Sequence, residues 1–195
     1  MIEHIQQAYG GSGMTAYITH TACLGHNMGE GHPEGPERLA AIKDRLMAAQ
    51  VFDFLNQVDA PTVSASQLAR VHPPKYIEYL ESVQPTVGTY RVDTDTAMNS
   101  GTLAAARHAA GAVVKAVDMV MHKQAPNAFC AIRPPGHHAE TRKAMGFCFF
   151  NNIAVGAMHA IAEHSIERVA ILDFDVHHGN GTEEIFKNDE RVMLL

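Results

Sequence analysis

The sequence predicts one α/β domain of three layers, with helices on both faces of a mostly parallel sheet. Two short apolar runs, 128–132 and 169–172, are typical of strands buried on both faces of a parallel sheet. The apolar residues between them recur at helical spacing, which predicts a strand–helix–strand unit with a right-handed crossover. The length of 195 residues fits a single domain of this class.

Apolar spacing and turn residues predict the other elements. Residues 36–49 form an amphipathic helix, because Leu39, Ile42 and Leu46 share one face. The sequence contains no internal repeat or low-complexity tract. In chain order, the predicted elements outside the strand–helix–strand unit are a strand at 16–19, a glycine-rich loop at 20–35, the helix at 36–49, helices at 64–71 and 74–83, a polar loop at 84–99 with a trace of strand near Tyr90, a helix from about Ser100, and a buried strand at 192–195.

Composition and charge exclude several classes of partner. Fifteen Lys and Arg against twenty-one Asp and Glu give a formal charge of −6, which argues against direct binding of nucleic acid or anionic lipid. No apolar run approaches the roughly 20 residues of a membrane-spanning helix. Three cysteines, an odd number in apolar surroundings, predict a soluble protein of the reducing cytoplasm. The oligomeric state stays open, and a homo-oligomer is compatible with the sequence.

Charged and imidazole side chains follow the second apolar run. Asp173, Asp175 and His177 are two residues apart, so in an extended backbone they share one face, while Phe174 and Val176 anchor the other. Carboxylate oxygen with imidazole nitrogen suits Zn²⁺ or another first-row divalent ion better than Ca²⁺. The alternative is that the aspartates cap the next helix and the histidines are ordinary loop residues.

A second histidine pair follows the first apolar run. Two prolines and Gly136 stiffen the loop at 133–139, so His137 and His138 are held in place. Side-chain oxygens of Asp173 and Asn180 in the other loop can each orient one imidazole. Because functional groups in open parallel sheets gather beyond the carboxyl ends of the strands, both loops are expected to form one site.

Longer strings around these residues carry a family resemblance. They are 32–39 (HPEGPERL), 133–139 (RPPGHHA), 146–152 (GFCFFNN) and 173–182 (DFDVHHGNGT). Together they resemble the zinc-dependent histone deacetylase superfamily, above all its class II type and the bacterial acetylpolyamine amidohydrolases, over residues 16–195. The resemblance implies the arginase and deacetylase fold and zinc-dependent hydrolysis of an acetyl amide, in acetylated lysine or an acetylated polyamine.

The resemblance assigns the metal sites. Asp175 and His177 match the first two zinc ligands of the family. Asp173, Asp175 and His177 also match the residues that lend oxygens, largely from the backbone, to a structural K⁺ beside the zinc. Both ions are therefore expected cofactors.

The resemblance also assigns the acid–base residues. His138 matches the histidine that acts as general base and then general acid, with Asn180 as its partner. His137 matches the electrostatic histidine, which is paired with Asp173.

Three further positions match parts of the family that contact substrate or product. Gly146 and Phe147 match the wall of a narrow channel that grips the extended acyl-lysine or acyl-amine chain. Arg38 matches an arginine that lines the internal cavity through which acetate is thought to leave. The neighbouring Phe149 and Phe150 are expected in the core.

Two parts of the family pattern have no counterpart in the sequence. They are a third zinc ligand, an aspartate, and an oxyanion-stabilising tyrosine in a Gly-Gly-Tyr context, both expected beyond Leu195. The prediction is therefore that 14–195 is the N-terminal part of one catalytic domain, incomplete at its C-terminus, and that 1–13 is a tag or linker. As an isolated chain it is expected to bind metal weakly at most and to have no useful turnover.

Two other functions remain as alternatives. One is a binding module that keeps the fold but has lost turnover through truncation. The other is an arginase-like hydrolase with two Mn²⁺ ions, which would demand more Asp-x-His sites than the sequence supplies. His20, His26 and His32 could line a pocket but are predicted as solvated loop residues, and His159 and His164 are predicted on the polar side of their helix, with no role.

Overall fold

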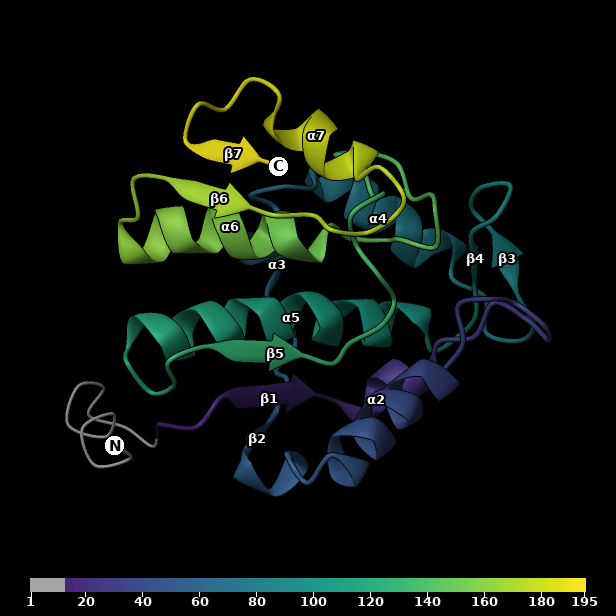
Figure 1. Cartoon of the computed structure of the whole chain (residues 1–195). Helices are drawn as coiled ribbons and strands as arrows, with labels where there is room; N and C mark the ends of the chain where they lie inside the picture. Colours follow the sequence, from purple (N-terminus) through teal and green to yellow (C-terminus); the bar gives the residue numbers. More distant parts are fainter. Residues whose placement is uncertain (1–12) are drawn as a thin grey trace.

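The computed structural model describes residues 13–195, and most of its strands run parallel (Figure 1). Apart from Gly13, the predicted tag or linker lies outside the described residues. No described helix has the length and apolar character needed to cross a membrane. The elements are β1 Ala16–Thr19, η1 Thr21–Gly25, α2 Glu37–Ala48, η2 Phe52–Phe54, β2 Asn56–Asp59, α3 Ala65–Leu68, α4 Pro74–Val83, β3 Tyr90–Arg91, β4 Ala97–Met98, α5 Thr102–Met121, β5 Ala128–Cys130, α6 Asn152–His164, β6 Val169–Ile171, α7 Asn180–Phe186 and β7 Val192–Leu194.

The strands form two parallel sheets and one short antiparallel pair. The first sheet has the order β2-β1-β5, the second pairs β6 with β7, and β3 pairs with β4 in antiparallel fashion. Strands β5 and β6 therefore do not pair with each other within the described residues, and the predicted strand–helix–strand unit does not join adjacent strands. Apolar runs indicate parallel strands and a crossover helix, but they do not set how many positions the crossover skips.

The first sheet is covered on both faces, as the predicted layers require. Tyr17 of β1 faces α2 in one core cluster, whereas Ile18 faces α5 in another, because successive strand residues point to opposite faces. Helix α6 then packs on α5. A Cβ on Gly156 of α6 would lie 2.4 Å from Val113 Cγ1, so the close approach of these helices requires glycine there.

The largest core cluster lies under α4, α5 and α6 and includes Phe149 and Phe150, which are 0% and 1% exposed. Their prediction as core residues is confirmed. The expectation that both apolar runs are buried on two faces is only partly met, since Phe129 and Leu172 are 47% and 69% exposed. Strand β2 was not predicted, because its sequence NQVD has a single apolar residue and forms the edge of its sheet.

Local signals explain where the helices begin. Ser64 caps α3 in a capping box with Gln67, and Asn151 caps α6 by accepting a hydrogen bond from the Ala154 amide. Pro74 occupies the first turn of α4, where a missing N–H costs nothing. These caps fix the starts of elements that the apolar spacing alone had placed to within a few residues.

Candidate active site

The two histidine loops leave β5 and β6 at their carboxyl ends, and the two strands point the same way in Figure 1. A cavity of about 560 Å³ lies between them, lined by Cys130 and Ile132 on one side and Ile171 on the other. The lining also includes His137 and Asp173 from the two loops. The predicted convergence of the loops is therefore present although the strands are not adjacent.

Two hydrogen-bonded dyads stand side by side at this edge. His137 Nδ1 lies 2.8 Å from Asp173 Oδ2, and His138 Nδ1 lies 2.7 Å from Asn180 Oδ1. The imidazole ring centroids are 4.0 Å apart. Both oxygens accept, so each ring donates through Nδ1–H.

The orientation of Asn180 is fixed from its other side. Its Nδ2 donates to Glu140 Oε1 at 3.3 Å, which leaves Oδ1 to face His138. The two dyads consequently differ in charge, because a carboxylate supports His137 and a neutral amide supports His138.

Asp175 and His177 lie next to these dyads. Asp175 Oδ1 is 3.0 Å from His177 Nδ1 and also accepts from the His177 amide at 2.8 Å. That backbone hydrogen bond is the main cause of the lowered pKa of Asp175. The ring centroids of His138 and His177 are 6.1 Å apart, so the Asp175–His177 pair lies next to His138.

The donor atoms of Asp175 and His177 suit a zinc ion. Tetrahedral zinc has bonds of about 2.0 to 2.2 Å to nitrogen and oxygen, so neighbouring ligand atoms lie a little over 3 Å apart. The oxygen and nitrogen of this pair already lie 3.0 Å apart. The predicted anchoring by Phe174 and Val176 is wrong for the described residues, because these side chains are 91% and 93% exposed.

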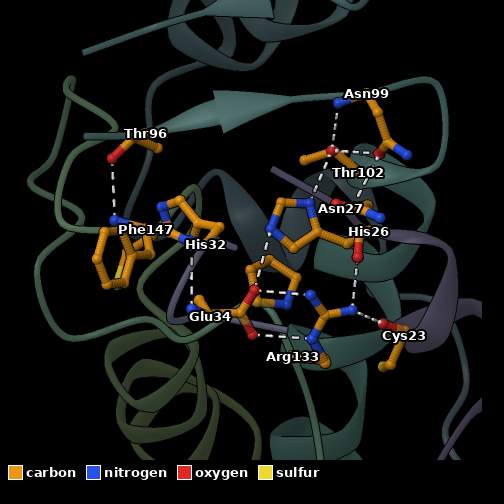
Figure 2. Close-up of polar contacts among 12 residues, drawn as sticks. Cys23, His26, Asn27, His32, Glu34, Thr96, Asn99, Thr102, Arg133 and Phe147 are labelled. Atoms are coloured by element: carbon orange, nitrogen blue, oxygen red, sulfur yellow. Dashed lines mark hydrogen bonds and ion pairs between the residues drawn. The ribbon is translucent and has the colours of Figure 1, made fainter. Parts of the chain in front are cut away.

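Gly146 lies against His138, and Phe147 follows it in the chain. Gly146 has a φ of +55°, and a Cβ there would lie 2.4 Å from His138 Cδ2. The Phe147 amide donates to Thr96 Oγ1 at 2.9 Å, and its ring meets the edge of His32 at 4.6 Å between centroids. Figure 2 shows His32 beside Phe147. His32, predicted as a solvated loop residue, therefore contacts Phe147, one of the two residues predicted to line the channel.

A buried ion pair supports the loop that carries His137 and His138 (Figure 2). The Arg133 side chain is fully buried and makes a bidentate contact with Glu34 at 2.8 and 2.7 Å. Its other nitrogen donates to the carbonyls of Cys23 and His26, each at 2.6 Å. The backbone immediately before Pro134 is thereby fixed to the loop around η1.

His26 belongs to the same buried group, so its prediction as a solvated residue is wrong. Its Nδ1 lies 2.8 Å from Thr102 Oγ1, while Nε2 has no hydrogen-bond partner among residues 13–195 and lies 3.4 Å from Glu34 Oε2. Burial lowers the pKa of His26 to about 4. The only sequence signal for this network was the pairing of opposite charges, Glu34 and Arg133, inside two of the family strings.

A second buried group ties the loop after β5 to helix α7. His72 Nε2 accepts from the Asn151 amide at 2.9 Å, and Nδ1 lies 3.1 Å from the Thr141 carbonyl. Asn151 Nδ2 donates to Ala139 O and to Thr182 Oγ1, both at 3.1 Å. Burial lowers the pKa of His72 to about 4, so the ring is neutral near pH 7. Sequence reasoning gave none of these residues a role.

Arg38 lies at the cavity between the two loops. Its guanidinium donates to the Ile132 carbonyl at 2.8 Å and is 3.7 Å from Glu34, and the side chain is 44% exposed. It lines the cavity together with His137 and Asp173. This position is compatible with the internal-cavity role that the resemblance implies, and the role stays a prediction.

One cluster of three side chains that could hold a metal ion occurs in the described part of the chain. Asp118, His159 and His164 bring their donor atoms within 4.8 Å of one another, far along α5 and α6. Asp175 and His177 are a pair at the strand ends and do not belong to this cluster. The prediction that His159 lies on a polar helix face is wrong, since it is 4% exposed.

The scaffold and the site define a class of protein. A parallel α/β fold presents two oriented imidazoles beside a carboxylate–imidazole pair at its strand ends, an arrangement suited to metal-assisted hydrolysis. The family described as "Histone deacetylase domain" matches residues 32–195. The chain belongs to the histone deacetylase family.

Similar proteins come from all three domains of life. The chain is 41% identical over 165 residues to the histone deacetylase-like amidohydrolase of Pseudomonas aeruginosa, covering 85% of this chain and 43% of that protein. It is 38% identical over 184 residues to a probable deacetylase of Archaeoglobus fulgidus, covering 93% and 50%. Human polyamine deacetylase HDAC10 is 35% identical over 168 residues, covering 83% and 25%.

A solved structure agrees with the fold. The crystal structure of the HDA15 HD domain superposes with a TM-score of 0.87 at 35% identity, over 93% of this chain and 52% of that one. The chain thus spans about half the length of the first curated relatives and of this structure.

Proposed function

We propose that this chain carries the acid–base residues and two metal ligands of a zinc-dependent hydrolase that acts on acetyl amides. The observation that carries the proposal is the geometry at one sheet edge. Two oriented imidazoles, 4.0 Å apart, stand beside a carboxylate–imidazole pair whose donor atoms are 3.0 Å apart. Membership in the histone deacetylase family supports the same chemistry.

Asp175 and His177 would hold the zinc. Bound there, zinc would polarise the amide carbonyl and make a coordinated water more acidic. The K⁺ expected beside Asp173, Asp175 and His177 rests on the resemblance alone and stays a prediction.

The two dyads have different roles in the reaction. His138 keeps its Nε2 lone pair free, because Nδ1–H is engaged by Asn180, so it takes a proton from the attacking water and returns it to the departing amine. His137 faces the carboxylate of Asp173, which stabilises a positive charge on the ring. His137 therefore acts as the electrostatic member and His138 as the base.

The substrate class follows from the wall beside His138. Phe147 and His32 meet edge to face there and present flat ring surfaces, which suit an extended aliphatic chain between the amide and the rest of the substrate. Acetylated lysine and acetylated polyamine both have such a chain. Relatives named histone deacetylases and a polyamine deacetylase are compatible with either substrate.

Metal binding by the 195-residue chain tests the first half of the proposal. Co²⁺ is titrated into metal-free protein carrying D118N and H164Q, so that the separate cluster on α5 and α6 cannot contribute. We expect one Co²⁺ per chain, and at least tenfold weaker binding after D175A or H177A, on the order of the loss for one lost metal contact. H178A is the matched control, because His178 is an equally exposed neighbour paired with Glu183.

Hydrolysis tests the second half and is measured in the complete protein that carries this sequence. Acetate release from an acetyl-lysine peptide and from an acetylated diamine is followed with wild type and H138A. We expect release with at least one substrate and a loss of about 100-fold or more in H138A. Two Mn²⁺ ions at the strand ends would replace the proposal by the arginase-like alternative, and substrate binding without acetate release would replace it by the binding module.

A further inference from the structure

Asp118, His159 and His164 lie at the opposite end of the molecule from the strand-end site. Helices α5 and α6 lead into the beginnings of β5 and β6, whereas His137 and His177 follow the ends of those strands. Asp118 lies near the end of α5, and His164 is the last residue of α6. In Figure 1 these helix ends lie on the left, and the strands point to the right.

The three side chains converge on one point. Nε2 of His159 and Nε2 of His164 each lie 2.7 Å from the same oxygen, Asp118 Oδ1. The side chains are 5%, 11% and 33% exposed for His159, His164 and Asp118 respectively. The site is therefore closed on the helix side and open at the carboxylate.

The two helices hold the donor atoms without help from a flexible loop. Helices α5 and α6 pack closely around Gly156, and a rigid scaffold reduces the entropy cost of gathering ligands. Two imidazole nitrogens with one carboxylate oxygen suit Zn²⁺, Co²⁺ or Ni²⁺, whereas Mg²⁺ and Ca²⁺ prefer oxygen alone.

Access and a further ligand are both present. A polar cavity of about 420 Å³ reaches the cluster and is lined by all three residues together with His122 and Glu163. The ring of His122 lies 5.2 Å from that of His164. A hydrated ion can enter from this cavity and take His122 or a water as its fourth ligand.

Arg70 opposes a metal at this position. Its NH1 lies 3.0 Å from His159 Nδ1, and its NH2 contacts Glu163. A guanidinium only donates, so His159 must accept at Nδ1 and carry its proton on Nε2, toward Asp118. A metal on Nε2 requires that proton to move to Nδ1, which displaces Arg70 onto Glu163 alone.

We propose that Asp118, His159 and His164 form a second binding site for a divalent transition-metal ion, which links α5 to α6 and competes with Arg70 for His159. The site is separate from the strand-end pair and does not depend on the proposed hydrolysis.

The test uses the 195-residue chain carrying D175A and H177A, which removes the strand-end pair. Co²⁺ is titrated into this metal-free protein while absorbance and thermal unfolding are followed. We expect one Co²⁺ per chain, a higher Tm with the ion, and at least tenfold weaker binding after D118N or H164Q. D44N is the matched control, because Asp44 is an exposed acid on α2 and its loss should leave binding unchanged.

Arg70 provides the second, independent variant. R70Q removes the competing donor and a positive charge, so Co²⁺ should bind at least severalfold more tightly. Absence of Co²⁺ binding in the D175A and H177A background would overturn the proposal, as would binding that D118N leaves intact. If D118N and H164Q fail to fold by circular dichroism, R70Q decides, since unchanged or weaker binding there also rejects the site.

Discussion

The two loops at the strand ends differ in how the rest of the molecule holds them. The loop after β5 is anchored by fully buried Arg133 and by Asn151, and its His137 side chain is only 17% exposed. In the loop after β6, Asp175 and His177 are 50% and 74% exposed and contact each other. Buried contacts therefore order the loop of His137 and His138, whereas Asp175 and His177 are held by local hydrogen bonds.

This difference has a physical consequence for metal binding. Ordering an exposed loop costs conformational entropy, on the order of 1 to 2 kcal/mol per residue fixed. An ion that bridges Asp175 and His177 must offset that cost, whereas a proton transfer at His138 needs no such ordering. The metal affinity should thus be the more easily changed of the two properties.

Removing the charge of Glu34 is expected to have the largest effect on stability, and it tests whether the Arg133–Glu34 pair anchors the loop after β5. E34Q leaves the fully buried Arg133 guanidinium without its carboxylate, so the free energy of unfolding should fall by about 3 to 5 kcal/mol. Urea unfolding measures it. E81Q is the control, because Glu81 and Arg107 form a more exposed pair worth about 1 kcal/mol or less. Equal losses in the two variants would show that the buried pair does not anchor the loop.

Low pH should reduce the stability of the fold, because two buried histidines must take up protons. Burial holds the pKa of His26 and of His72 at about 4, below the usual 6.5. Between pH 6.5 and 4 the unfolded chain binds protons that the folded chain refuses, so stability is retained above pH 6.5 and falls as pH drops. Each histidine should remove up to about 3 kcal/mol over that window.

Urea unfolding at several pH values measures this loss. H72Q keeps a donor and an acceptor but cannot be protonated, so the fall in stability between pH 6.5 and 4 should be about half that of wild type. A slope unchanged by H72Q would mean that His72 takes its proton normally in the folded chain.

The sequence predicted which candidate residues lie together better than it predicted the residues that support them. His137, His138, Asp175 and His177 follow apolar runs directly, so the strand-end rule was enough to bring them together. The supporting residues Glu34, His26 and His72 are distant in sequence from the loops they hold, and no periodic pattern marks them. Tertiary contacts of this kind are not encoded in local spacing.

The fold was predicted at the level of elements and layers but not of strand order. The runs that became β5 and β6 were correctly placed as strands, yet pairing depends on which edges meet in three dimensions. Strand β2 was not predicted from the sequence, because it lies at the edge of its sheet and Val58 is its only apolar residue. The polar face assigned to His159 failed because α6 packs on α5 there.

Substitution of Gly146 by alanine tests how closely Gly146 fits against His138 in the loop after β5. Gly146 and Gly88 both have positive φ, +55° and +73°, but only at Gly146 would a Cβ meet His138, at 2.4 Å. G88A should cost about 1 kcal/mol of backbone strain. G146A should add a displacement of His138 and lower acetate release in the complete protein by about 100-fold. If both alanine variants hydrolyse substrate alike, the fit between Gly146 and His138 has no role in the reaction.

The smallest expected effect concerns the charge difference between the two dyads. N180D gives His138 a carboxylate partner like the one that His137 has in Asp173. A carboxylate at this distance stabilises the protonated imidazole more than a neutral amide does. Because the base must be unprotonated to accept a proton from water, the rising limb of the pH–activity profile should move to higher pH.

The measurement is acetate release in the complete protein across pH, with N180S as the control. Serine removes the amide without adding charge, so it should lower the rate but leave the limb in place. A limb that stays fixed in N180D would mean that His138 is not the group whose deprotonation limits the reaction. The neutral partner of His138 would then have no bearing on its basicity, and the contrast between the two dyads would be one of position only.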